Sequence, residues 1–557
     1  MPTIPTINNY KDLVAFNKSL IASNKNLPEL NLEGADFNKN SIKVNGEVHF
    51  VDEFLYNYVV NHTGILTGKV AGLSRYDYTR LNYLLHPETK EEFISSLREY
   101  INNILLMGDE GVVLWDFIVT LCNNEIVLSK CNKPKALGIF IPNFITRIGA
   151  HAFEEQDIEK VIIEQHSQLK SIGDYAFTSC GKLNTIKLPE GLEAIGKYAF
   201  GYCKIKSLSI PNSVTSIGDN AFTSCEKLNT IKLPEGLETI GKYAFSHCRF
   251  KEIVIPNSVT SIEHAAFYSG SLERVSFKNN SRLKHIGDYA FAVCTALKEI
   301  NLPSSLISID DSALIHTALK EIEIPDSVTK LGKGVFEYCT GLEIAIVGRG
   351  VSELPALTFR KCEALKEITI LGNPSIIGSK AFGGSALTEI LIPSSVKEIQ
   401  DNAFMGCQEL RSVRFQDNSS LELIGESAFS VCTVLEEINL PSSLVKIDAQ
   451  VFHACDGLKK IEIPDSVEKM GMKTFEYCCN LESVRIGKGV KEIPLGTFDG
   501  CTSLRKIVLL GNIEKISPYA FEYDSKEARG VSLKVYMPKT SKFETNEIDE
   551  RVEIIKR

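Results

Sequence analysis

The chain has 557 residues, of which 24% are charged and 44% hydrophobic, the composition of an ordinary soluble globular protein. Its 61 basic and 70 acidic side chains give a formal net charge of −9, which argues against a general nucleic-acid binder. The first residues lack the basic and apolar regions of a secretory signal, and the most apolar stretch, Val112 to Cys122, is too short to span a bilayer.

Residues 1 to about 135 carry no internal repeat and predict a small, mostly helical domain. A β-hairpin is predicted over 41–50, because Asn45-Gly46 lies between two runs of alternating apolar residues. Pro87 is well placed to open a helix whose apolar stripe indicates a buried face rather than a cofactor site. Helices are predicted over 9–23, 52–60, 76–85 and 87–107. We expect this domain also to cap the repeat array that follows.

A block of about 23 residues then recurs seventeen times between Leu137 and Asp524. Its anchor is Phe, and once Leu314, at intervals of 22 to 25 residues, a period typical of solenoids. In each copy Leu-x-x-Ile-x-Ile-Pro predicts a strand with both isoleucines inward and a proline at its end. Ser-Val-x-x-Ile-Gly predicts a turn, and x-x-Ala-Phe-x-x-Cys predicts a short turn of α- or 3₁₀-helix. Stacked copies are expected to form one parallel sheet.

Twelve of the fifteen cysteines lie three residues after the repeat anchor, from Cys180 to Cys501. One residue type at one repeat position predicts a buried column, because free cysteine packs as a small hydrophobe. Gly270, Thr317 and Ser385 fill the same position in other copies, so small size matters more than sulfur chemistry. A column of free thiols favours a reducing compartment.

The array also contains a longer duplication, in which residues 282–373 recur as residues 420–512 after a displacement of 138 to 139 positions. Beyond Phe521 the repeat decays, and residues 531–536 predict a final strand before a charged end. The predicted domains are therefore 1–135, the array over 136–524, and a C-terminal cap strand and tail over 525–557.

The unit Leu-x-x-Ile-x-Ile-Pro-x-Ser-Val-x-x-Ile-Gly-x-x-Ala-Phe-x-x-Cys resembles the BspA-like leucine-rich repeat class, also called the Treponema pallidum type. The resemblance covers about 390 of the 557 residues. It implies an α/β solenoid, a right-handed array of about 17 coils with a concave parallel sheet. Members of this class are mostly adhesion or interaction proteins of bacteria and some protozoa. The resemblance therefore implies a protein-binding role.

The outward strand positions are the candidate binding residues, because the fold does not dictate them. In the middle coils they form an acidic stripe beside exposed apolar residues, an arrangement typical of interfaces, although soluble surfaces also favour Glu. Like charges on one face would steer a protein partner with a basic or mixed surface. The predicted partner-binding residues are Glu299, Glu321, Glu323, Ile344, Ile346, Glu367, Glu389, Leu391 and Arg414.

No catalytic or cofactor motif stands out, so we predict a non-enzymatic interaction scaffold with no cofactor, metal site or nucleic-acid partner. The candidates for nucleophile–base chemistry are Cys122, Cys131, His49, His62 and His86, whose geometry the sequence does not fix. Two alternatives stay open: an N-terminal enzymatic or effector module that the repeats target, and a cell-surface adhesin. The expected location is the cytoplasm, or outside the cell after export without a cleaved signal peptide, as for a translocated bacterial effector.

Overall fold

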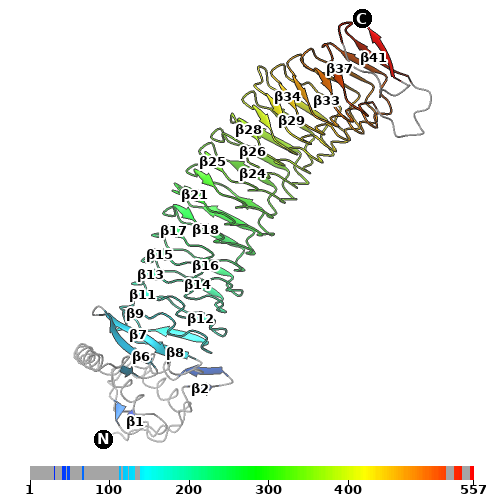
Figure 1. Ribbon diagram of the computed structural model, residues 1–557. Helices are drawn as coiled ribbons and strands as arrows, with labels where there is room; N and C mark the ends of the chain where they lie inside the picture. Colours follow the sequence, from blue (N-terminus) through cyan, green and yellow to red (C-terminus); the bar gives the residue numbers. More distant parts are fainter. Residues whose placement is uncertain are drawn as a thin grey trace. The chain divides into compact units, whose positions relative to one another are not determined.

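The computed structural model describes residues 30–31, 41–44, 47–50, 66–67, 112–114, 117–122, 125–131, 138–521, 532–541 and 552–557. The chain divides into two compact units, Met1–Phe250 and Lys251–Arg557, which are taken separately below. In each unit the repeats form stacked coils whose strands lie side by side (Figure 1).

A coil provides a first strand, from the Leu-x-x-Ile-x-Ile segment, and a second strand, from the Val-x-x-Ile-Gly segment, except that the coil of Ile344–Val347 has only an isolated bridge between Leu354 and Ile377 in place of a second strand. In the first unit the first strands are β8 (Gly138–Ile141), β10 (Lys160–Ile163), β12 (Thr185–Ile186), β14 (Ser207–Ser209) and β16 (Thr230–Lys232). The second strands are β9 (Arg147–Ile148), β11 (Ser171–Ile172), β13 (Ala194–Ile195), β15 (Ser216–Ile217) and β17 (Thr239–Ile240).

The second unit continues this alternation. Its first strands are β18 (Glu252–Ile255), β20 (Arg274–Phe277), β22 (Glu299–Ile300), β24 (Glu321–Ile324), β26 (Ile344–Val347), β27 (Glu367–Ile370), β29 (Glu389–Ile392), β31 (Ser412–Phe415), β33 (Glu437–Ile438), β35 (Lys460–Ile463), β37 (Ser483–Ile486) and β39 (Lys506–Leu509). Its second strands are β19 (Ser261–Ile262), β21 (His285–Ile286), β23 (Ser308–Ile309), β25 (Lys330–Leu331), β28 (Ile376–Ile377), β30 (Glu398–Ile399), β32 (Leu423–Ile424), β34 (Lys446–Ile447), β36 (Lys469–Met470), β38 (Glu492–Ile493) and β40 (Lys515–Ile516).

Strands of neighbouring coils pair in parallel. First strands pair in short runs such as β24-β26-β27, and second strands pair in longer runs such as β28-β30-β32-β34-β36. The predicted parallel sheet of a leucine-rich-repeat solenoid is confirmed, with about 18 turns where about 17 coils were expected. The second sheet was not predicted, because its segment was expected to form only a turn. The right-handed sense and the concave placement of the first sheet stay predictions.

The core of each unit is built from columns of identical side chains. In the first unit the rings of Phe153, Phe177, Phe200, Phe222 and Phe245 are fully buried or nearly so, and they stack with centroids 4.8 to 5.4 Å apart. In the second unit an unbroken stack runs from Phe336 to Phe521, with planes within 12° of parallel. Leu314 interrupts the column between Phe291 and Phe336, as its sequence position predicts.

The cysteine column is buried as predicted, and each thiol also makes a hydrogen bond. Cys203 Sγ donates to the carbonyl oxygen of Phe177 in the preceding coil at 3.2 Å, and the other column cysteines repeat this contact at 3.0 to 3.2 Å. Burial raises the pKa of Cys180 and Cys225 to about 12, so these thiols stay protonated at neutral pH.

The x-x-Ala-Phe-x-x-Cys segment is not helical, and the prediction of a short α- or 3₁₀-turn is wrong in the described residues. Two residues per coil have positive φ, for example Tyr175 at 57° and Ser179 at 58°. Such residues break a right-handed turn and point alternate N–H groups out of it. The N–H groups of Tyr175, Phe177 and Ser179 bond to the next coil, at 2.7 to 2.9 Å, while those of Ala176 and Cys180 bond within their own turn.

The small, mostly helical N-terminal domain is not supported by the described residues. The ranges predicted to be helical lie outside them, and the described part of residues 1–135 consists of β1 (Leu30–Asn31), β2 (Ser41–Val44), β3 (Glu47–Phe50), β4 (Leu66–Thr67), β5 (Val112–Leu114), β6 (Phe117–Cys122) and β7 (Glu125–Cys131). The predicted hairpin is confirmed, because β2 and β3 pair antiparallel from Ser41–Phe50 to Val44–Glu47.

A β-meander, rather than helices, adds to the second-strand sheet at the start of the array. Strands β5, β6 and β7 pair antiparallel, and β7 pairs in parallel with β9 through Val127 and Leu128. Val119, Ile126 and Leu128 are buried, so the apolar alternation of these segments covers the first coil.

At the other end β41 (Leu533–Met537) lies where a final strand was predicted. It pairs in parallel with β39, and β42 (Val552–Lys556) pairs with β41 over five residues. The last coil is therefore covered by two further strands of the same chain.

The turn around each Phe anchor contains two positions with positive φ, where glycine is the least strained residue. Gly406 has a φ of +71° and open space where a side-chain methyl group would lie, so Gly406→Ala should lower the free energy of unfolding by about 1–2 kcal/mol through backbone strain alone. Gly181 is equally open but lacks the positive φ, and Gly181→Ala is the matched control. Denaturant unfolding of both variants measures the difference, and equal stability of the two would contradict this account of the turn.

The buried column also predicts thiol reactivity. Of the fifteen cysteines only Cys122 is exposed and only Cys479 is half-buried, so DTNB should modify at most two thiols in the folded protein. The other thirteen should react only after denaturant unfolds the coils, because reaction needs an accessible thiolate. Rapid modification of more than two thiols without loss of structure would contradict the column.

Candidate protein-binding groove

Outward side chains of the first strands form ion pairs between neighbouring coils of the second unit. Arg274 Nη2 lies 3.2 Å from Glu299 Oε2, and Arg414 Nη2 lies 3.6 Å from Glu389 Oε2. The same arrangement recurs where Arg485 Nε lies 2.9 Å from Glu462 Oε1. The parallel register places Arg274 directly opposite Glu299 and Arg485 directly opposite Glu462, whereas Arg414 reaches Glu389 diagonally from the position opposite Leu391.

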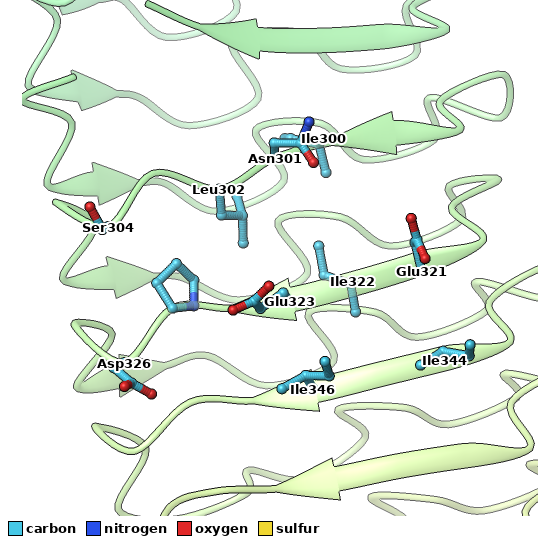
Figure 2. Close-up of a pocket in the computed structure, with 11 residues that line it drawn as sticks. Ile300, Asn301, Leu302, Ser304, Glu321, Ile322, Glu323, Asp326, Ile344 and Ile346 are labelled. Atoms are coloured by element: carbon cyan, nitrogen blue, oxygen red, sulfur yellow. The ribbon is translucent and has the colours of Figure 1, made fainter. Parts of the chain in front are cut away.

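A groove of about 510 Å³ opens on this face between β22 and β26. Glu321 and Glu323 stand on β24, and Ile344 and Ile346 stand on β26, as Figure 2 shows. The registry places Glu321 opposite Ile344 and Glu323 opposite Ile346, so each carboxylate has an apolar neighbour where other coils supply an arginine. The full lining, called the β24 groove below, is Ile300, Asn301, Leu302, Ser304, Glu321, Ile322, Glu323, Pro325, Asp326, Ile344 and Ile346.

The groove exists because the ladder of first strands is interrupted beside β24. Strand β22 pairs with β20 but not with β24 in the described residues, and it is only two residues long. Leu302 ends this coil in place of the isoleucine found at Ile324, and leucine has the lower strand propensity. Leu302 is half-buried and lines the groove, whereas Ile324 is fully buried.

The three carboxylates of the groove differ in their partners. Asp326 accepts the backbone N–H of Arg349 at 2.8 Å and faces the Arg349 guanidinium at 2.5 Å. The Arg349 backbone and side chain together lower the pKa of Asp326. Glu321 and Glu323, in contrast, have neither an ion-pair partner nor a side-chain hydrogen bond among the described residues. These two exposed carboxylates are available to a ligand.

The predicted site residues are spread over six first strands, from β22 to β31. Glu321, Glu323, Ile344 and Ile346 come together in the groove, and Ile344 is 41% exposed. Glu367 lies beside it on β27, in register with Ile344. Glu299 lines an adjoining hollow of about 310 Å³, where Arg274 pairs with it. Glu389, Leu391 and Arg414 belong to the separate run β29-β31-β33, so their membership in the same surface stays a prediction.

Sequence reasoning missed the floor of the groove. Ile300, Leu302 and Pro325 were treated as structural positions, and Asp326 as a variable one. The signal that could have found them is the Leu-Pro ending of one coil next to the Ile-Pro ending of the following coil, which marks a short strand beside a long one.

The internal duplication repeats most of the residues that line the groove. Strands β33, β35 and β37 of the second copy correspond to β22, β24 and β26, with the same interruption between β33 and β35. Eight of the eleven lining residues are identical in the two copies. The three that differ replace Glu321 by Lys460, Ile344 by Ser483 and Ile346 by Arg485.

The candidates for nucleophile–base chemistry are not brought together in the described residues. Cys122 is exposed at the end of β6 and Cys131 is buried at the end of β7, while His49 lies in β3. His62 and His86 lie outside the described residues. Within the described ranges no group of three or more His, Cys, Asp or Glu side chains could hold a metal ion. In the same ranges no helix has the length and apolar character needed to cross a membrane.

The repeats match a family model described as a BspA-type leucine-rich repeat region of six copies. The matches span residues 146–273, 216–343, 260–385, 343–440 and 410–528, which together cover well over half of the chain. The chain therefore belongs to the BspA-type leucine-rich repeat family, as its repeat consensus predicted.

Several solved structures are similar to the chain. A leucine-rich repeat protein from Bacteroides ovatus is 27% identical, covering 76% of this chain and 90% of its own, with a TM-score of 0.46. A leucine-rich cell surface protein from Faecalibacterium prausnitzii is 22% identical, with coverage of 75% and 96% and a TM-score of 0.37. A leucine-rich repeat protein from Eubacterium ventriosum is 20% identical, with coverage of 64% and 91% and a TM-score of 0.33. No curated protein matched the sequence.

The paired carboxylate of the groove predicts a pH dependence. Because the pKa of Asp326 is lowered in the folded chain, its stabilising contribution is present above the ordinary aspartate pKa of about 4 and is lost as the pH falls through the lowered value. Asp326→Asn should therefore lower the free energy of unfolding at pH 7, and the difference from wild type should shrink as the pH falls below about 4. Glu321→Gln, which removes no ion pair, is the control, and a loss as large as that of Asp326→Asn would contradict the assignment.

Proposed function

We propose that this protein is a protein-binding scaffold whose binding surface is the outward face of the first strands around the β24 groove. The observation that supports it best is the exposed Ile344 and the half-buried Ile346 beside two carboxylates that have no ion-pair partner in the described residues. Apolar side chains next to unpaired charges cost solubility if they stay uncovered, and this combination is typical of interfaces.

The duplicated copy supports a functional rather than a structural reason for these residues. Lys460, Ser483 and Arg485 stand on equivalent strands whose inward positions remain buried, so the fold accepts either set of outward side chains. The acidic, apolar set is therefore not required for folding. A partner with a basic or mixed surface would complement it.

The duplication also provides the test. Glu321→Lys/Ile344→Ser/Ile346→Arg transplants the second copy's residues into the β24 groove, and it should abolish capture of partners that the wild-type chain retains. Truncation of central interface residues commonly costs 2 kcal/mol or more, so a loss of affinity of at least about thirtyfold is expected. Affinity capture from the cells that produce the protein, read out by mass spectrometry, measures it.

A matched control is Val254→Ser, because Val254 is an outward residue of β18 with 52% exposure and lies outside the β24 groove. It should leave the captured set unchanged. The proposal fails if the triple variant unfolds like wild type in denaturant and still captures the same proteins, or if Val254→Ser loses them as well.

We further propose that the protein acts where thiols stay reduced, in the cytoplasm or after export without a cleaved signal peptide. The fifteen free cysteines support this location. Fractionation of the producing cells tests it, and recovery on the outer cell surface would instead favour an adhesin.

A further inference from the structure

The outward carboxylates of the second unit show what kind of group they bind. Glu299, Glu389 and Glu462 are each paired with the guanidinium of an arginine on a neighbouring coil. Guanidinium is the cation that suits an exposed carboxylate best, because its planar donors form directional, charge-assisted hydrogen bonds. Arginine is therefore a ligand that this face already uses.

The β24 groove lacks the arginine that its duplicate has. Glu323 corresponds to Glu462, and the position that Arg485 occupies beside Glu462 is filled by Ile346 beside Glu323. Glu462 and Arg485 are in contact at 2.9 Å within the chain, whereas Glu323 stays without a partner among the described residues. The internal copy thus shows a guanidinium bound at the equivalent carboxylate.

We propose that the β24 groove binds an extended segment of a partner protein that carries arginines two residues apart, and this rests on the proposed function. Glu321 and Glu323 are themselves two residues apart on β24, so their side chains lie on one face about 6.6 Å apart along the strand. An Arg-x-Arg segment in extended conformation presents its two side chains on one face with the same spacing.

The apolar lining completes the recognition. The aliphatic stem of an arginine packs on apolar surface while its head group reaches a carboxylate. Ile344 and Ile346 lie opposite Glu321 and Glu323, so they are placed to contact these stems. Asp326 is occupied by Arg349 and adds no free carboxylate, which limits the groove to two guanidinium groups.

The test uses defined peptides with the full-length chain. Fluorescence anisotropy would compare a labelled Thr-Arg-Thr-Arg-Thr peptide with the same composition respaced to Thr-Arg-Thr-Thr-Arg and with Thr-Glu-Thr-Glu-Thr. We expect the Arg-x-Arg peptide to bind at least tenfold more tightly than either control, and raised salt to weaken it. Glu321→Lys/Ile344→Ser/Ile346→Arg should remove this binding.

A gain of binding in the second copy cannot be explained by unfolding, so the opposite substitutions, called the reverse graft, provide a second test. Lys460→Glu/Ser483→Ile/Arg485→Ile converts the second copy into the first, and it should raise the number of Arg-x-Arg peptides bound per chain from one to two. Equal binding of the two arginine spacings, no effect of the triple variant, or a reverse graft that adds no site would each overturn the proposal.

Other outcomes separate this proposal from the function on which it rests. The triple variant could lose its captured proteins while the wild-type chain does not bind the Arg-x-Arg peptide. The groove would then bind proteins through a motif other than Arg-x-Arg, and only the arginine proposal would fail. If sedimentation shows a wild-type dimer that the triple variant loses, the occupant is a second copy of this chain, which also overturns it.

Discussion

The backbone hydrogen bonds between successive coils are the constraint on which the rest of the structure depends. In the turn around each Phe anchor, which contains two residues with positive φ, alternate N–H groups donate to carbonyl oxygens of the next coil, as those of Tyr175 and Phe177 do. Because these bonds fix the coil spacing, the phenylalanine rings stack near 5 Å and each column thiol reaches the Phe carbonyl of the preceding coil. The strain of positive φ at non-glycine residues is tolerated because the neighbouring coils satisfy the turn's polar groups.

Because the backbone bonds and the inward side chains hold the coils together, the outward strand positions are not needed for folding. The two copies of the duplicated segment show it most clearly, since Ile322 and Ile461 are buried alike while Glu321 and Lys460 carry opposite charges on the outside. One backbone therefore presents two different surfaces six repeats apart. In the second copy Arg485 neutralises Glu462 within the chain, whereas the first copy leaves Glu323 open and places isoleucines beside it. We propose that the first copy is the one that binds a partner.

The inward half of the repeat could be predicted from sequence. A residue type that recurs about every 23 positions occupies the same place in every coil, and the core is the part of the structure that all coils share. The Phe and Cys columns and the parallel first strands follow from that. The turn was mistaken for a helix, because Tyr175 and Ser179 give no sign of positive φ in a sequence without glycine at these positions. The groove could be predicted only in part: alternation placed Glu321 and Ile344 outward, but the interrupted ladder beside Leu302 depends on how two adjacent coils pair, which a single repeat does not encode.

We propose that the first copy of the duplicated segment, and not the second, contacts a partner. Hydrogen–deuterium exchange of the full chain, with and without a captured partner, tests it within one molecule. We expect slower exchange in peptides that cover β24 and β26, with no change in those that cover β35 and β37. Equal protection of both copies, or protection confined to other strands, would contradict it.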